Sequence, residues 1–203
     1  KRVGPKGHVI GIDFSAPMLV RARERADTGL PLNFILADAT VHPFEPGRAD
    51  VVTSRFGVMF FADPVISFVN IRKALRPGGR LVFACWQEPR KNPWMMLPLQ
   101  AAYKHVPRLP EASPEDPGPF SFAREDRVRR ILSAAGFSSI AMEPVELILD
   151  IAVARGLDAA VHGALSIGPV SRALDGQPPE LIAAAANSIR AALAPLEQVN
   201  SVM

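Results

Sequence analysis

The stretch that decides the fold is "GHVIGIDFSAPML", residues 7–19. Its first half predicts a short buried strand over 8–13, because a β-rich apolar run of this length rarely begins a helix. Ser15 is a favourable N-cap, and the proline two residues later suits the first turn of a helix predicted over 16–28. The strand therefore ends on a carboxylate, Asp13, at the point where a helix begins.

The alternation of strand and helix continues along the first 140 residues. Further strands are predicted over 32–38, 49–56 and 80–86, and further helices over 63–75 and 124–137. Short strands that alternate with helices imply right-handed βαβ crossovers and a parallel sheet. The predicted class is α/β, a Rossmann-like, mostly parallel sheet with helices on both faces.

The composition excludes several classes of protein. Of the 203 residues 48% are hydrophobic, and the net charge of +3 comes from scattered basic residues, so no nucleic-acid partner is expected. No run of about 18 apolar residues and no secretory leader occur, so no membrane span is expected. The single cysteine, Cys85, excludes an internal disulfide, fits the reducing cytoplasm and is interpreted as a small buried hydrophobe.

The pattern changes in the second half of the chain. Eight of the twenty prolines fall within 88–120, which is too apolar for a plain linker. We expect a Pro-rich cap there, inserted into a single domain over 1–203, and a mobile connector is the alternative. A further strand is predicted over 138–149. A helical C-terminal insertion is predicted over 150–203, with helices near 157–167 and 179–194.

Two acids stand at predicted strand ends. Ligands of an open parallel sheet bind outside the carboxyl ends of its strands, where Asp13 and Asp38 are expected. A carboxylate suits the two hydroxyl groups of a ribose, since it is a two-pronged acceptor. A helix cap or a turn acid explains Asp13 equally well. The ribose interpretation by itself does not choose between a nicotinamide dinucleotide and S-adenosylmethionine.

Five motifs in order carry a family resemblance: "GIDFSAPML", "LADA", "ADVVTSRFGVMFFADP", "LRPGGRL" and "AAGF". Their order and spacing resemble the class I S-adenosylmethionine-dependent methyltransferases, and most closely the branch of the ubiquinone and menaquinone biosynthesis methyltransferases. The resemblance covers residues 1 to 147 well and the remainder loosely. It implies S-adenosylmethionine as cofactor.

The resemblance also implies roles for single residues at the cofactor. Asp13 matches the acid that holds both ribose hydroxyls, and Phe14 and Met18 match positions that flank the adenine ring. Asp38 and Ala39 match the pair that hydrogen-bonds to the adenine ring, the acid accepting from the amino group and a backbone N–H donating to a ring nitrogen.

Further positions follow from the same resemblance. Ser54 and Arg55 match positions near the methionine end of the cofactor. The "RPGG" turn and Asp50 match structural positions and are left off the site.

One departure from the family stands out. The glycine-rich loop that follows the first strand of these enzymes has no counterpart, and no convincing closing strand follows residue 195. We therefore expect a fragment that lacks the first and last strands. In the family's strand order the first strand separates the strands at 8–13 and 49–56, so these two are not expected to pair directly.

The resemblance implies methyl transfer, and the apolar side chains of the Pro-rich cap favour a small, partly hydrophobic acceptor molecule. Two alternatives stay open, a nicotinamide-dependent oxidoreductase and a non-catalytic methyltransferase fragment. The sequence assigns no catalytic residue, no metal site and no oligomeric state. If a general base is used, His42, Tyr103 and His105 are candidates by position. Tyr103 is followed directly by Lys104 and lacks the Tyr-x-x-x-Lys spacing of one oxidoreductase class.

Overall fold

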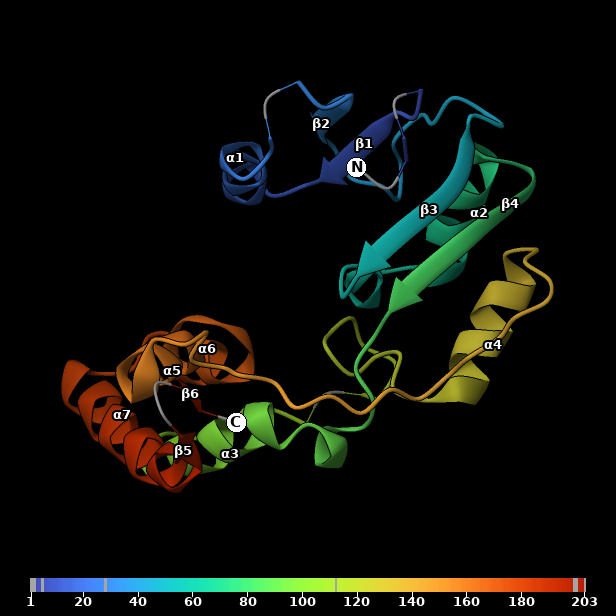
Figure 1. Cartoon of the computed structure of the whole chain (residues 1–203). Helices are drawn as coiled ribbons and strands as arrows, with labels where there is room; N and C mark the ends of the chain where they lie inside the picture. The colour runs from blue at the N-terminus through green and yellow to red at the C-terminus, as the bar shows by residue number, and fades with distance from the viewer. Residues whose placement is uncertain (1–2, 5, 28, 112, 199–200, 203) are drawn as a thin grey trace. The chain divides into compact units, whose positions relative to one another are not determined.

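A computed structural model describes residues 3–4, 6–27, 29–111 and 113–198, and the backbone of 201–202 (Figure 1). The chain divides into two compact units. Unit 1 comprises Lys1–Ala84 and Arg127–Ile140, and unit 2 comprises Cys85–Asp126 and Ala141–Met203.

Unit 1 begins with the strand and helix that the opening stretch predicts. Strand β1 (Val9–Asp13) is followed by helix α1 (Ala16–Glu24) and strand β2 (Leu32–Leu36), and β1 and β2 pair in parallel over their full length. The Ser15 side chain accepts a hydrogen bond from the Met18 amide at 3.4 Å, so the predicted N-cap is confirmed. The helix ends earlier than residue 28.

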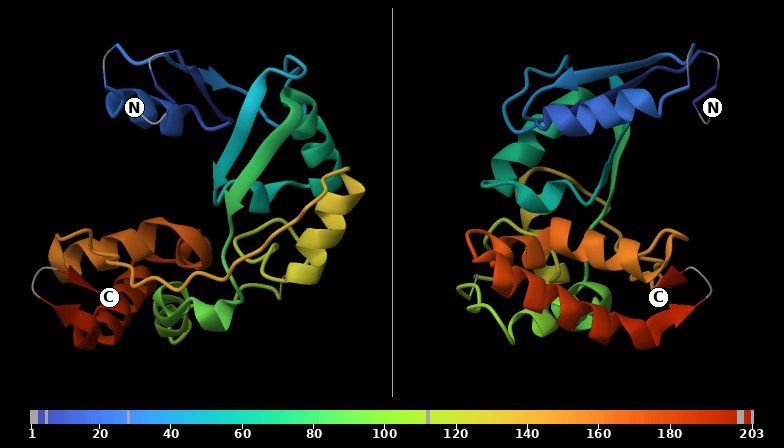
Figure 2. Two further views of the ribbon diagram at one scale, coloured as in Figure 1. Left: turned by 45° about the vertical axis from the view of Figure 1, so that its right-hand side comes forward. Right: turned by 90° about the vertical axis from the view of Figure 1, so that its left-hand side faces the viewer.

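A second βαβ arrangement follows in unit 1. Strand β3 (Ala49–Arg55), helix α2 (Pro64–Ala74) and strand β4 (Leu75–Ala84) succeed one another, and β3 pairs with β4 in parallel. The left view of Figure 2 shows these strands side by side. The Asp63 carboxylate caps α2 by accepting a hydrogen bond from the Ile66 amide at 3.0 Å, which places this helix start where the sequence predicts it.

The strand predicted over 80–86 begins earlier, at Leu75, just before the "RPGG" turn, and ends at Ala84. Pairing starts at Leu75, opposite Ala49, and the register then shifts before it becomes regular. Gly78 has a φ of 75°, in the left-handed region that favours glycine. The turn therefore leads the chain into the regular part of β4, which pairs with β3, as the sequence indicates.

Aromatic packing around Phe68 forms the core of this part of unit 1. Phe68 lies on α2 and is fully buried. Its ring meets those of Phe61, Phe83 and Phe137 at centroid distances of 5.7, 5.7 and 6.3 Å. Phe61 directly follows a short 3-10 helix, η1 (Val58–Phe60). Aromatic rings from three other segments of the chain thus pack around the one buried ring of Phe68.

The last of these rings, that of Phe137, lies just after the end of helix α4 (Glu125–Ala134). Gly136 follows the helix with a φ of 83°, and the Phe137 amide donates to the Leu132 carbonyl at 3.0 Å. This is the glycine-terminated helix end that the sequence predicts.

The described strands of unit 1 form two separate two-stranded parallel sheets rather than one continuous sheet. Parallel pairing and the α/β class are confirmed. Across the described residues no ladder joins β1 to β3, which is what we expect if another strand belongs between them.

Unit 2 is mainly helical. Helices α5 and α7 confirm the two C-terminal helices that the sequence predicts, whereas α3 and α6 are not predicted. The helices among the described residues of this unit are α3 (Pro93–Ala102), α5 (Gly156–Ser166), α6 (Gly168–Leu174) and α7 (Pro179–Leu193). Short 3-10 helices occur at Pro89–Lys91 (η2) and Ala194–Leu196 (η3), and β5 (Glu197–Gln198) pairs antiparallel with β6 (Ser201–Val202).

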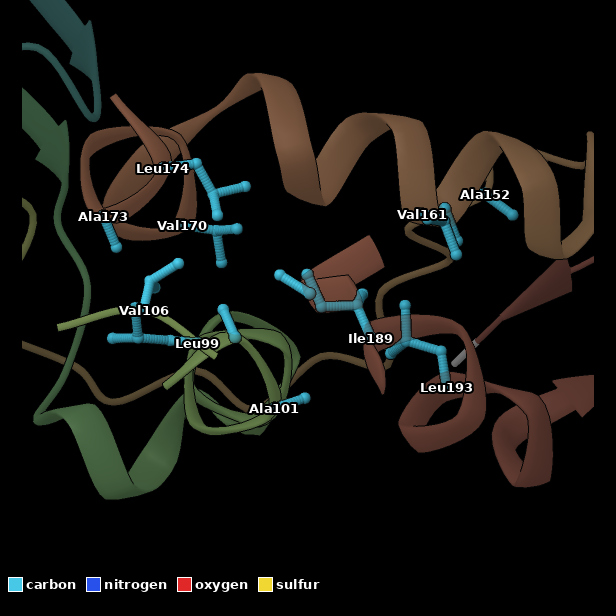
Figure 3. Close-up of a cluster of buried hydrophobic side chains, with 13 residues drawn as sticks. Leu99, Ala101, Val106, Ala152, Val161, Val170, Ala173, Leu174, Ile189 and Leu193 are labelled. Atoms are coloured by element: carbon cyan, nitrogen blue, oxygen red, sulfur yellow. The ribbon is translucent and has the colours of Figure 1, made fainter. Parts of the chain in front are cut away.

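The core of unit 2 is aliphatic and lies among its helices. Helix α7 packs against both α3 and α5, and α6 packs against α3 and α5. Figure 3 shows Leu99, Val161, Val170, Ile189 and Leu193 among the buried side chains of this cluster. The stretches 88–120 and 150–203 both belong to unit 2.

The strand predicted over 138–149 is wrong. These residues are described but form no ladder with any described strand. Val145, Leu147 and Ile148 are all exposed. Apolar residues here favour an extended backbone, but a strand also needs a neighbouring edge to pair with.

We predict that the purified chain self-associates as its concentration rises. A two-stranded sheet leaves an unpaired edge on each strand, and Ile10 on β1 is 54% exposed. Replacing Ile10 by lysine places a charge on this surface and opposes edge-to-edge pairing. Sedimentation velocity over a concentration series should show a lower average mass for Ile10→Lys than for the parent chain.

The matched control is Val3→Lys, because Val3 is exposed but belongs to no strand. It adds the same charge and should leave the association unchanged. Equal loss of association in both variants would mean that net charge, and not the strand edge, governs it.

Candidate functional site

Two carboxylates share one edge of the first sheet. Asp13 is the last residue of β1, and Asp38 lies two residues beyond the end of β2. The Ala37 amide donates a hydrogen bond to the Asp13 carbonyl at 3.1 Å, which holds the two strand ends together. Parallel pairing thus brings the two predicted site acids to the same end of the sheet.

Each acid uses one oxygen in a local turn. Asp13 Oδ1 accepts from the Ser15 amide at 2.8 Å, and Asp38 Oδ1 accepts from the Thr40 amide at 2.8 Å. These bonds fix the orientation of both carboxylates. Within the described part of the chain, neither Oδ2 accepts a hydrogen bond, so one prong of each carboxylate is available to a ligand.

Large apolar side chains lie exposed beside Asp13. Phe14 is 77% exposed and Met18, on the first turn of α1, is 60% exposed. Exposure of two such neighbours leaves an apolar surface next to a charged acceptor. That combination suits a ligand with both a flat ring and hydroxyl groups.

An amide side chain braces the loop that carries the second acid. Asn70 on α2 donates to the Ala39 carbonyl at 3.1 Å and to the His42 carbonyl at 2.9 Å. The buried hydroxyl of Ser67, one turn earlier, donates to the Asp63 carbonyl at 2.7 Å, and its oxygen lies 3.2 Å from Thr40 Oγ1, from which it can accept. Helix α2 therefore positions Ala39, although neither Asn70 nor Ser67 is among the predicted site residues.

Ser54 and Arg55 lie at the end of β3, in the second sheet. No hydrogen bond within the described chain joins either residue to Asp13 or Asp38. The next residue, Phe56, has a φ of 62°, which is uncommon for an aromatic residue, and its amide donates to the Ala84 carbonyl at 3.0 Å. The structure thus places both residues at a strand end, and no hydrogen bond within the described chain links them to the acids.

The three candidate bases have packing roles. The His42 ring lies edge-on to Phe44 at 4.9 Å, and His105 Nε2 lies 2.7 Å from Ser188 Oγ. The Tyr103 hydroxyl accepts from the Leu109 amide at 3.4 Å. These contacts assign no catalytic residue.

Asp50 has the structural role expected of it. Its carboxylate accepts a hydrogen bond from Arg76 Nε at 2.6 Å, which joins β3 to the "RPGG" turn.

Burial raises the pKa of the Cys85 thiol. The thiol contacts the Phe122 carbonyl, with Sγ 3.6 Å from the oxygen. A higher pKa means less thiolate at neutral pH, which fits a packing residue rather than a nucleophile.

Two other kinds of site are absent from the described residues. They contain no cluster of three or more His, Cys, Asp or Glu side chains arranged to hold a metal ion. No helix among them has the length and apolarity needed to cross a membrane.

Comparison with known proteins gives the family. A methyltransferase-domain model matches residues 1–83. Over 156 residues the chain is 33% identical to demethylmenaquinone methyltransferase of Thermus thermophilus, covering 68% of this chain and 67% of that protein. It is 32% identical to malonyl-[acyl-carrier protein] O-methyltransferase of Xylella fastidiosa, covering 56% of this chain and 37% of that protein.

Solved structures support the same fold. A crystal structure of a candidate methyltransferase from Bacillus halodurans aligns with a TM-score of 0.52 at 15% identity, covering 86% of this chain and 71% of that one.

The sequence matches show the family. The chain belongs to the class I S-adenosylmethionine-dependent methyltransferases. Within that family it belongs to the branch that includes the quinone-biosynthesis methyltransferases. Nothing in these comparisons supports the oxidoreductase alternative.

The family's cofactor is S-adenosylmethionine, and the residues present fit its nucleoside part. The available Oδ2 atoms of Asp13 and Asp38 can accept from hydroxyl and amino groups, and Phe14 and Met18 can cover a ring. This fit rests on the donor and acceptor chemistry of the strand ends.

We predict that Asp13→Ala weakens S-adenosylmethionine binding by about 10- to 100-fold in the natural full-length protein. The loss of hydrogen bonds to a charged acceptor costs about 1.5–3 kcal/mol. Calorimetric titration measures the change. Asp38→Asn should cost less, because an amide still offers one acceptor to an amino group.

Ser15→Ala is the matched control, since it removes the α1 cap but leaves both carboxylates. Its binding should stay close to that of the parent. If the Asp13→Ala variant binds S-adenosylmethionine within twofold of the parent, Asp13 serves only the local turn and does not bind the cofactor. A larger loss in Asp38→Asn would mean that the two acids are assigned the wrong way round.

We predict slow thiol–disulfide exchange at Cys85 in the folded chain. Its raised pKa leaves the thiol protonated at pH 8, so its reaction with a disulfide reagent should be roughly tenfold slower than in the urea-unfolded chain. The rate should rise with pH. An equal rate in both states would show that the thiol is neither desolvated nor shielded.

Proposed function

We propose that this protein transfers a methyl group from S-adenosylmethionine to a small, partly hydrophobic acceptor molecule. The observation that carries the proposal is the pair of acids at the carboxyl ends of β1 and β2, each with one oxygen left for a ligand. Family membership supports the reaction class.

Each predicted cofactor residue has a proposed task. Asp13 binds the ribose hydroxyls, Phe14 and Met18 pack against the adenine, and Asp38 accepts from the adenine amino group while the Ala39 amide meets a ring nitrogen.

The methionine end of the cofactor lies, in this proposal, near Ser54 and Arg55. Both residues are at the end of β3, where ligands of parallel sheets bind.

When bound, S-adenosylmethionine supplies a methyl group already activated on a sulfonium sulfur. The residues of the chain then have to hold donor and acceptor in line and exclude water, which is worth about 7–11 kcal/mol in well-aligned reactions. Such a site needs no dedicated base, in keeping with the packing roles of His42, Tyr103 and His105.

The chemistry of the acceptor follows from relatives and composition together. One relative is named for demethylmenaquinone and another for a malonyl-acyl-carrier protein. The stretch 88–120 of this chain holds Trp94, Met95, Met96 and Tyr103. These apolar side chains favour an acceptor with a hydrophobic part.

We further propose that the 203 residues form part of one methyltransferase-like domain. In it, 88–120 is a cap inserted after β4, and 150–203 is a helical C-terminal insertion. The chain spans 67% of the Thermus relative and 37% of the Xylella relative. The open edges of β1 and β3 support a further strand between them, supplied by sequence outside the 203 residues. The lone cysteine favours a cytoplasmic location.

The test of the function is calorimetry with S-adenosylmethionine and with NAD. We expect S-adenosylmethionine, and not NAD, to bind. Both the 203-residue chain and a version extended by any coding sequence upstream of Lys1 should be titrated. Binding by the extended version alone would support the missing strand and leave the function intact. Binding of NAD, or of neither ligand by either version, would overturn the function.

Transfer is then measured with methyl-labelled S-adenosylmethionine. Demethylmenaquinone and malonyl-acyl-carrier protein serve as two acceptor arms, because relatives are named for them. Binding without transfer to any small or carrier-bound acceptor would favour the non-catalytic alternative.

A further inference from the structure

The loop after β2 folds its backbone amides back onto Asp38. The Thr40 amide donates to Asp38 Oδ1 at 2.8 Å. The Val41 and His42 amides donate to the Asp38 carbonyl at 3.2 and 2.8 Å. Within the described part of the chain, the Ala39 amide donates to no acceptor. The loop therefore leaves one N–H for a ligand, on the residue that follows the Asp38 carboxylate.

A donor next to an acceptor matches a ring that carries an amino group beside a ring nitrogen. The ring nitrogen accepts from the N–H, and the amino group donates to the carboxylate. An oxo group in place of the amino group sets an acceptor against the carboxylate and a protonated nitrogen against the N–H. Such a pair selects the amino form only while donor and acceptor keep a fixed relation.

Asn70 on α2 fixes this loop from outside it. Its amide nitrogen donates both protons, to the Ala39 carbonyl at 3.1 Å and to the His42 carbonyl at 2.9 Å. Both partners are acceptors, which determines that the nitrogen and not the oxygen of the side chain faces them. A second contact to the same helix joins Thr40 Oγ1 to Ser67 Oγ at 3.2 Å. Helix α2 thus holds the loop at its start, middle and end.

We propose that Asn70 is a positioning residue for recognition of the cofactor's adenine. By holding the Ala39 and His42 carbonyls, it keeps the Ala39 N–H and the Asp38 carboxylate in the relation that an amino-substituted ring needs. Asn70 contacts the loop and not the ligand. The inference rests on the proposed function, in which these two groups bind adenine, and adds that selectivity for the amino group depends on α2.

The binding test compares S-adenosylhomocysteine with S-inosylhomocysteine, which carries an oxo group in place of the amino group. Calorimetric titration of the natural full-length protein should show that the adenosyl compound binds about tenfold more tightly or better, because two hydrogen bonds are reversed in the other compound. Asn70→Asp keeps the size of the side chain, but its carboxylate cannot donate to the two carbonyls. We expect this variant to retain a preference of about threefold or less. Asn70→Ala should lie between the two, since water can bond the carbonyls.

Asp63→Ala is the matched control for lost stability. It removes the N-cap hydrogen bond of the same helix and leaves the Asn70 contacts in place. Its unfolding temperature should fall while the preference for the adenosyl compound stays that of the parent. A preference reduced as much as in Asn70→Asp would mean that the stability of α2, and not the contacts of Asn70, sets it.

A second measurement needs no ligand. Amide hydrogen exchange at Thr40 and His42, whose N–H groups donate within the loop, reports how firmly the loop is held. By NMR we expect exchange at these amides to be about fivefold faster or more in Asn70→Asp than in the parent. In Asp63→Ala it should stay within about twofold of the parent.

The two measurements separate this inference from the proposed function. Unchanged preference or unchanged exchange in Asn70→Asp would overturn the positioning role, and so would a parent protein that binds the two compounds equally well. A parent that binds neither compound would refute the proposed function, and with it any role of Asn70 in adenine recognition. Tight adenosyl binding with a preference that Asn70→Asp leaves intact would refute the positioning role alone.

Discussion

Parallel pairing of neighbouring strands is the constraint on which unit 1 depends. Two parallel strands cannot be joined by a tight turn, so each pair needs a crossing segment, and α1 and α2 fill that need. The same constraint gathers the carboxyl ends of paired strands. Asp13 and Asp38 are neighbours because β1 and β2 run in one direction, although 24 residues separate them along the chain. A functional edge thus follows from strand direction alone.

Features set by local chemistry were predictable from sequence. Ser15 and Asp63 cap helices because their side-chain oxygens reach the free amides of the first turn, and both partners lie within three residues. Gly136 ends a helix for an equally local reason. Features set by distant partners were not predictable. The extended segment 138–149 has strand composition but no edge to pair with, and the short helix α6 carries little periodicity.

The same distinction between local and distant partners applies to the residues of the candidate site. The acids were found because they end strands, which is a local signal supported by the order of five motifs. Asn70 was missed because its partners, the carbonyls of Ala39 and His42, lie about thirty residues earlier. Two polar residues one turn apart on α2, Ser67 and Asn70, beside the buried ring of Phe68, were the available signal. Such a pair on a helix face that packs inward indicates hydrogen bonds to backbone elsewhere.

The hydrogen bonds of Asn70 affect how the loop after β2 responds to salt and pH. Asn70 holds this loop through an uncharged amide, which neither titrates nor attracts counterions. Exposed ion pairs such as that of Arg76 with Asp50 weaken as ionic strength rises, because mobile ions screen them. The support that Asn70 gives to this loop is therefore insensitive to salt and pH, whereas the bond from the Thr40 amide to the Asp38 carboxylate is the charged part of the loop's support.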